Sequence, residues 1–223
     1  MKYRNPIITD SGGFQVFSLL YGSVAEELKS KGKKRNGEGG VLKISEDGVL
    51  FRNYRDGSKM LFTPETSVDH QKALGADLII PFDELPPYHC DPDHLLASLE
   101  RTHRWELRSL ARHLSLPNDQ AMYAVVHGGT DPELRERSAV ALRAHPFDGF
   151  ALGGSFGKTD TDLQGVVKHT MPFLPTERPV HLLGIAHESG IDACVPFGVD
   201  TFDSCYPARV ARHGTLLTKR CIV

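Results

Sequence analysis

Residues 7–14 read IITDSGGF, and this stretch constrains the fold more than any other part of the chain. An apolar run ends abruptly at a carboxylate, and a turn of small residues follows at once. The same pattern recurs in LIIPFD at residues 78–83 and in VDTFD at residues 199–203. Buried parallel strands deliver polar side chains to one rim of a sheet in this way. Each aspartate alone is equally well explained as a helix cap, but the repetition favours one shared site formed by Asp10, Asp83 and Asp203.

The composition describes a globular chain without a broad basic surface. Hydrophobic residues make up 40% of the 223 positions, charged residues make up 24%, and the net charge is −2. A near-neutral chain can still bind nucleic acid through a local basic patch. Its length is sufficient for one large α/β domain. No run is apolar enough for a membrane span, so we expect no membrane partner and a cytoplasmic location.

The four cysteines are scattered along the chain and form no CxxC pair, at positions 90, 194, 205 and 221. They therefore predict neither a disulfide framework nor a metal site within this sequence. Scattered thiols suit a reducing compartment.

Six apolar runs, each followed by polar residues or glycine, predict barrel strands at 6–9, 76–82, 121–126, 149–152, 180–185 and 199–202. Helices are predicted between most of them. One begins at the Thr63-Pro64 cap and ends at Gly75, a second runs from Asp91 to His113, and a third runs from Asp131 to about Arg143. Alternation of strands and helices predicts an α/β fold, a TIM (β/α)₈-type barrel with about six of its eight strands present.

Two regions interrupt the alternation. Residues 29–40 are rich in lysine, arginine and glycine and predict an exposed basic loop. Residues 41–62 contain three short β-type runs separated by Asp-Gly pairs, which predict a small antiparallel hairpin insertion on the rim of the barrel. We expect residues 1–223 to form a single, partial barrel domain that carries this insertion.

Paired glycines end two further strands, in His127-Gly128-Gly129 and in Gly153-Gly154. Without side chains, such turns let a flat ligand approach the backbone, although either pair alone is also an ordinary tight turn. A histidine such as His127 can donate to a ligand carbonyl, and Phe14 and Leu183 can pack against the faces of a base. Each of these three residues also has an ordinary structural explanation.

Arg209 and Arg212 follow Asp203 closely and form a short basic cluster. Beside a nucleophile that acts on nucleic acid, arginines would bind phosphates or base edges. Without that nucleophile they would be read as a solvated surface pair.

These motifs together resemble the tRNA-guanine transglycosylases, also called the queuine or archaeosine tRNA-ribosyltransferase family. The resemblance rests on TDSGGFQ at 9–15, FDE at 82–84, VHGG at 126–129, LGG at 152–154, RTHRW at 101–105 and the segment from Asp203 to Arg212. It covers essentially the whole chain, with the motifs in the same order. The first and last motifs are specific, whereas the glycine pairs alone are not.

The resemblance implies a barrel enzyme that exchanges guanine at the wobble position of the tRNA anticodon for a 7-deazaguanine. By this resemblance, Asp203 is the nucleophile that forms a covalent bond to ribose, and Asp10 is the general acid and base. Recognition of the base is assigned to Asp83, His127 and the backbone of Gly154, with Phe14 and Leu183 packing on its two faces. Arg209 and Arg212 would contact the anticodon loop, and a homodimer is expected.

The chain departs from the family pattern at several positions. His127 stands where a glutamine is usual, which would make base binding depend on pH. Ser155-Phe156-Gly157-Lys158 replaces a longer run that ends in an acid, and Leu85 replaces a cysteine of bacterial members. We expect truncation at both ends, with the C-terminal subdomain and its zinc site of three cysteines and one histidine outside this sequence.

Two other interpretations remain. A non-catalytic or degraded homologue could serve as an accessory subunit in tRNA binding, although such a chain has no reason to keep all three aspartates. An unrelated barrel enzyme, such as a phosphate-binding aldolase or isomerase, would need a glycine-rich phosphate loop near the last strands. Only a weak version of that loop is present.

Overall fold

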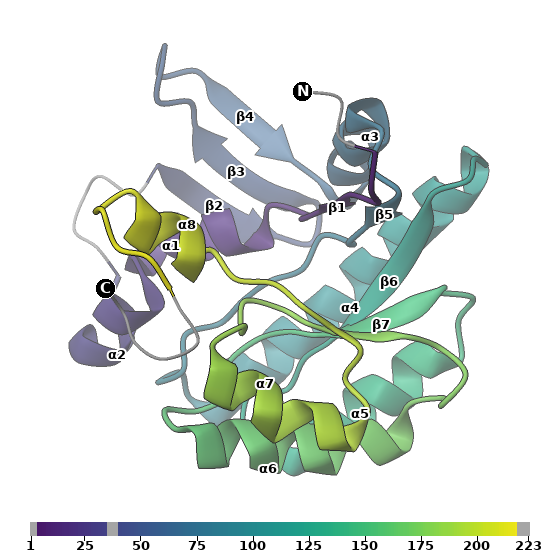
Figure 1. The fold of residues 1–223 in the computed structure, drawn as a ribbon. Helices are drawn as coiled ribbons and strands as arrows, with labels where there is room; N and C mark the ends of the chain where they lie inside the picture. The colour runs from purple at the N-terminus through teal and green to yellow at the C-terminus, as the bar shows by residue number, and fades with distance from the viewer. Residues whose placement is uncertain (1–3, 35–39, 218–223) are drawn as a thin grey trace.

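The computed structural model describes residues 4–34 and 40–217. Six parallel strands form one curled sheet, with helices packed along its outer face (Figure 1). The strands are β1 (Ile8–Thr9), β5 (Leu78–Ile79), β6 (Ala121–Val126), β7 (Gly149–Leu152), β8 (Val180–Leu182) and β9 (Thr201–Phe202). They lie in this order across the sheet, which confirms the predicted partial TIM-like barrel.

The strands β6 and β7 have the predicted bounds, whereas β1, β5, β8 and β9 are shorter than the apolar runs that predict them. Side chains supply hydrogen bonds to some of the backbone groups in and beside these strands. Beyond β5, Gln71 accepts from the Ile80 N–H at 3.0 Å and donates to the Ile80 carbonyl at 2.7 Å. Asp200 accepts from the N–H of Val180 at the start of β8. Buried backbone groups need partners of some kind, and here side chains provide them.

Each crossover between neighbouring strands contains a helix. These helices are α3 (Pro64–Leu74), α4 (Pro92–Ser115), α5 (Pro132–Arg143), α6 (Asp160–Thr170) and α7 (Glu188–Cys194). Thr63, Asp91 and Asp131 cap the first three of them, as the sequence predicts, and each cap is followed by a proline that suits the first turn. Short 3₁₀ turns follow α6 and α7, at Met171–Phe173 and Val195–Phe197.

The two faces of the sheet bury different side chains, as period-two alternation along a strand requires. Ile79, Ala124 and Leu152 face the helices and join the main core. Ile80, Val125 and Ala151 point to the concave side and form a smaller core of their own. Neither face is left to water, which is typical of parallel sheets.

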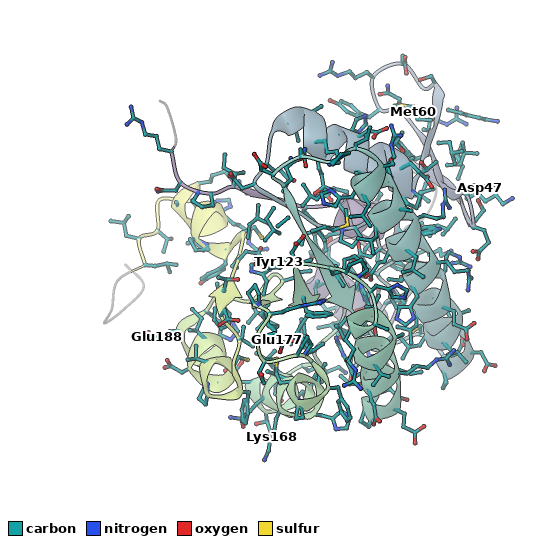
Figure 2. The ribbon with its side chains drawn as sticks, turned by 90° about the vertical axis from the view of Figure 1, so that its right-hand side faces the viewer. Asp47, Met60, Tyr123, Lys168, Glu177 and Glu188 are labelled. Carbon is teal, nitrogen blue, oxygen red and sulfur yellow. The ribbon has the colours of Figure 1, made fainter. Side chains whose placement is uncertain are left out.

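The insertion is a separate antiparallel sheet of β2 (Val41–Ser45), β3 (Gly48–Arg52) and β4 (Lys59–Phe62). Trp105 of α4 stacks on Phe82 with ring centroids 4.9 Å apart, and its indole N–H donates to the Glu46 carbonyl at 2.9 Å. Figure 2 places Asp47 and Met60 of this sheet on one side of the molecule, well away from Lys168 and Glu188 on α6 and α7.

Helices also flank the insertion. Residues Gly13–Tyr21 form α1, and Val24–Ser30 form α2, which Ser23 caps through a capping box with Glu26. The expectation of a loop over residues 29–40 is therefore wrong for residues 29 and 30, which belong to α2, while residues 35–39 lie outside the described part. The last helix, α8 (Tyr206–Ala211), follows β9.

Candidate active site

Asp10, Asp83 and Asp203 follow β1, β5 and β9, at the carboxyl ends of the strands. The strands β1 and β9 are the two outer strands of the sheet. The negative charges of Asp83 and Asp203 both act on Asp10. The three carboxyl groups therefore lie near one another at this end of the sheet.

The Asp10 carboxyl group is partly open to solvent, but the protein around its other sides removes much of its hydration. This desolvation raises the pKa of Asp10 to about 6, with further contributions from the charges of Asp83 and Asp203. The N–H of Ser11 donates to Asp10 Oδ1 at 2.7 Å and partly opposes the rise. A carboxyl group with a pKa near 6 can both give and accept a proton near neutral pH.

Asp83 is held from two sides. Ser11 Oγ donates to its Oδ1 at 3.1 Å, and His127 Nε2 lies 2.9 Å from its Oδ2. The backbone of Gly13 approaches this carboxylate so closely that a Cβ atom at position 13 would overlap it. Glycine is therefore required at this position, and the motif that contains Asp10 also shapes the surroundings of Asp83.

His127 is almost completely buried behind Asp83, with 4% of its side chain exposed. The backbone N–H of His127 donates to Ser138 Oγ at 3.1 Å, and the same hydroxyl lies 2.9 Å from His103 Nε2. Burial lowers the pKa of His103 to about 4, so that ring is neutral at physiological pH.

Asp203 has the opposite electrostatic setting from Asp10. His181 Nε2 lies 3.1 Å from its Oδ1, and the Gly184 N–H donates to the same oxygen at 2.8 Å. Desolvation by the surrounding protein acts to raise the pKa of Asp203, but these two hydrogen bonds outweigh it and the pKa is lowered. Near pH 6, Asp203 is therefore ionised, whereas Asp10 is only partly ionised.

The two glycine turns lie side by side after β6 and β7. Gly154 has a φ of +82°, and a Cβ atom there would lie 3.1 Å from His127 Nδ1. The buried guanidinium of Arg135 donates to the carbonyls of Val126 at 2.8 Å, Gly129 at 2.7 Å and Ser155 at 3.0 Å. Arg135 thus fixes both turns relative to each other.

A cavity of about 50 Å³ adjoins these turns, and His127 and Gly154 form part of its wall. Tyr88 and Ser155 also line it. Near its outer end, the Lys158 ammonium group lies 5.0 Å from the centre of the Tyr88 ring. A second cavity, of about 260 Å³, lies between α1, β2 and residues 84–87 and includes none of the three aspartates.

Phe14 and Leu183 lie after β1 and β8. Phe14 is 42% exposed in the first turn of α1 and stacks on Phe17 with centroids 5.8 Å apart. Leu183 is half-buried and packs against the concave core. The exposed ring of Phe14 is free to take a ligand on its open face, which an ordinary core residue would not be.

Arg209 and Arg212 lie in and just after α8, and both are exposed. The Arg209 guanidinium lies 5.9 Å from the centre of the Tyr206 ring. Within residues 4–34 and 40–217, neither arginine forms an ion pair, so both remain available to an external anion.

Sequence reasoning missed three residues of this site. Ser11 was visible only as a small residue of the turn, whereas His181 and Arg135 are polar residues within apolar patterns. A polar residue inside an otherwise apolar strand, one position before the end of β8, is the available signal for His181. For Arg135, no local signal distinguishes it from the exposed arginine at position 137.

The described residues do not supply the zinc ligands that the resemblance implies. In residues 4–34 and 40–217, no three histidine, cysteine, aspartate or glutamate side chains are arranged to hold a metal ion. None of the helices in that part of the chain is both long and apolar enough to cross a bilayer.

The fold and the site together define a class of protein: an α/β-barrel protein with its ionisable groups at the carboxyl ends of the strands. The model of one family, queuine tRNA-ribosyltransferase, matches residues 1–222. The chain belongs to this family.

Relatives of the same name support the assignment. The chain is 65% identical to a queuine tRNA-ribosyltransferase of Protochlamydia amoebophila, over 99% of this chain and 57% of the relative. It is 54% identical to the protein of that name from Chlamydia felis, over 96% of this chain and 58% of the relative. For Chlamydia pneumoniae the identity is 55%, over 98% of this chain and 59% of the relative. The chain thus spans less than two thirds of the length of these relatives.

Proposed function

We propose that this chain carries the reaction centre of a tRNA-guanine transglycosylase. In this reaction, guanine at the wobble position of the anticodon is replaced by a 7-deazaguanine, either queuine or its precursor. The pair of unlike carboxyl groups carries the proposal: Asp203 has a lowered pKa and Asp10 has a pKa of about 6. Two carboxyl groups whose surroundings separate their pKa values are suited to separate roles.

In the first step, the ionised Asp203 attacks the anomeric carbon of ribose. A carboxylate–ribose ester bond forms, the bond from ribose to guanine breaks, and Asp10 gives its proton to the departing base. In the second step, Asp10 takes a proton from the incoming base, which then attacks the same carbon and releases the Asp203 carboxylate. A covalent intermediate divides one difficult displacement into two easier ones.

Recognition of the base is assigned to Asp83 and His127, with the Gly154 backbone beside them. A carboxylate can accept from two adjacent N–H groups of a guanine edge, and His127 can donate to the base carbonyl. Phe14 and Leu183 would enclose the ring, and a base flipped out of a single-stranded loop reaches such a site without the cost of opening a duplex. Arg209 and Arg212 would contact the anticodon loop. A homodimer and a cytoplasmic location stay predictions of the resemblance.

The proposal is tested with the chain, an anticodon stem-loop RNA and labelled guanine. We expect incorporation of label and an adduct of protein and RNA that survives denaturant. Asp203→Asn should abolish both, whereas Asp192→Asn, which changes an exposed carboxylate on α7, should abolish neither. An adduct of unchanged yield in Asp203→Asn would refute the assignment. Binding of the RNA without an adduct in the unaltered chain would instead indicate an accessory subunit.

A further inference from the structure

His181 belongs to β8 and lies directly beneath the Asp203 carboxylate. Its side chain is 3% exposed, whereas that of Asp203 is 53% exposed. The histidine is therefore enclosed by protein on the side away from the ligand, and the aspartate stands between it and solvent. A buried imidazole that contacts a half-exposed carboxylate resembles the orienting arrangements found around reactive groups.

Both ring nitrogens of His181 have hydrogen-bond partners, Asp203 at Nε2 and Thr201 at Nδ1. The Asp203 carboxylate can only accept, so the proton on this contact belongs to Nε2. On the other side, Thr201 Oγ1 lies 2.8 Å from Nδ1. A hydroxyl can donate to Nδ1, which then needs no proton of its own. When Thr201 donates to Nδ1, the three side chains form a chain of hydrogen bonds that runs from Thr201 through His181 to Asp203.

Asp203 Oδ1 receives two donors, His181 Nε2 and the Gly184 N–H, while the structure gives Oδ2 no hydrogen bond among the described residues. The carboxylate is therefore fixed through one oxygen, and the other oxygen is left with its lone pairs free. Thr201 begins β9 and Asp203 follows the end of that strand two positions later. Both side chains contact the same His181 ring.

We propose that His181 is a positioning residue for Asp203 and that Thr201, by donating to Nδ1, keeps the proton of His181 on Nε2. Oδ2 of Asp203 is then the oxygen that bonds to the ribose. This inference rests on the proposed function, and it assigns roles to His181 and Thr201, for which the resemblance implies none.

The two donors on Oδ1 serve both steps. During attack they hold the plane of the carboxylate so that Oδ2 faces the anomeric carbon. In the ester, Oδ1 becomes the carbonyl oxygen and still accepts from both donors. When the second base arrives, the bond from Oδ2 to ribose breaks and the electron pair returns to the carboxylate, which the donors stabilise. A fixed donor of this kind contributes on the order of 100-fold to a rate.

Two substitutions separate positioning from mere packing. His181→Leu removes the donor, and we expect single-turnover adduct formation to slow by about 100-fold with little change in the affinity for RNA. His181→Gln keeps an N–H donor and should recover at least about a tenth of the original rate. Thr201→Val, which removes only the hydroxyl, should lie between the two. His169→Leu is the control, because this half-buried histidine of α6 contacts the Pro132 carbonyl and the Phe173 ring and has no contact with Asp203. Its adduct rate should match that of the unaltered chain.

The pH dependence gives a second kinetic readout. Asp203 must be ionised to attack, and loss of the His181 donor raises its pKa, so the acidic limb of the rate profile should move to higher pH in His181→Leu. Among the described residues, His181 is the titratable group that changes the pKa of Asp203, and the charge of Asp203 in turn raises the pKa of Asp10 after β1. We therefore expect His181→Leu to move the limb of the rate profile that reports Asp203 and to leave the limb assigned to Asp10 in place.

A measurement without substrate keeps the inference independent of turnover. Nitrogen NMR of the imidazole should show His181 protonated at Nε2 and not at Nδ1, and carbon NMR should show a higher pKa for Asp203 in His181→Leu. An Nδ1-protonated ring, or an Asp203 titration that His181→Leu leaves unmoved, would overturn the inference. If the unaltered chain forms no adduct while these spectra agree, the proposed function fails and the contact between His181 and Asp203 stands.

Discussion

At the scale of single residues, Glu106 shows how an acid behaves when it is buried without a cation. Its side chain on α4 is completely enclosed, and its Oε2 accepts from the Val125 N–H of β6 at 3.1 Å. Its other carboxyl oxygen has no hydrogen-bond partner among the described residues. Desolvation by burial, together with the nearby charge of Asp83, raises the pKa of Glu106 well above its usual range.

This raised pKa predicts the effect of Glu106→Gln on stability. Between the unfolded and folded pKa values the folded protein binds more protons, so the stability of the unaltered chain falls as pH rises through that range. Glutamine keeps the acceptor for Val125 and does not titrate. We expect Glu106→Gln to be more stable than the unaltered chain at pH 8, by about 1 kcal/mol or more, and the difference to vanish near pH 4.

Urea denaturation at a series of pH values measures this difference. Glu136→Gln is the matched control, because Glu136 is exposed on α5 and its change should leave stability nearly independent of pH. An equal loss of stability with rising pH in Glu106→Gln and in the unaltered chain would contradict the prediction.

The same scale shows which site residues sequence can predict. Asp10, Asp83 and Asp203 were predictable because a charge at the end of a buried strand stands out from its neighbours. Glu106 and His181 were not, because a single polar residue inside an amphipathic pattern is as often exposed as buried. Their surroundings depend on which strands lie beside them, and that information is not local.

At the scale of elements, Arg135 joins three segments around the glycine turns. It is 1% exposed, and its guanidinium lies 5.1 Å from the centre of the Phe156 ring. Burial lowers its pKa to about 9, which still leaves it charged at neutral pH. Its three acceptors are all backbone carbonyls, so Arg135 fixes the positions of the turns in addition to carrying a charge.

We predict that Arg135→Leu destabilises the fold by about 3 kcal/mol, because the Gly129 and Ser155 carbonyls lose their donor at about 1–3 kcal/mol each. The Val126 carbonyl keeps only the Gly153 N–H. Arg135→Lys keeps a charge but not the fork of donors, so it should recover only part of this loss. Arg137→Leu, at an exposed arginine paired with Glu100, should cost at most about 1 kcal/mol. Urea denaturation measures all three, and similar losses at positions 135 and 137 would refute the role of Arg135.

Helices were easier to predict than strands in this chain. The caps of α3, α4 and α5 are local signals, and their first residues agree with the prediction. The end of β5 differs because Gln71 binds the Ile80 backbone, which an apolar run alone would assign to the sheet. The helix α2 was not predicted, although Ser23 and Glu26 form a capping box at its start. The basic residues that follow it favoured a loop from residue 29.

At the scale of the whole molecule, the site depends on the curl of the sheet. Asp10 follows one outer strand and Asp203 follows the other, with four strands between them. No local pattern in the sequence determines how far such a sheet curls. The electrostatic interaction of Asp10 with Asp203 therefore depends on how far the sheet curls.

This coupling gives a test of the assembled site that needs no substrate. The pKa of Asp10 is about 6, and after desolvation the charge of Asp83 raises it more than that of Asp203. Removing either negative charge should lower it, because a neighbouring carboxylate no longer opposes ionisation. Carbon NMR should therefore show Asp10 titrating at lower pH in Asp203→Asn, and at still lower pH in Asp83→Asn. Asp192→Asn should leave the titration in place. Asp10 and Asp203 follow the two outer strands of the sheet. An unmoved Asp10 titration in Asp203→Asn would therefore mean that the ends of these two strands do not lie near one another.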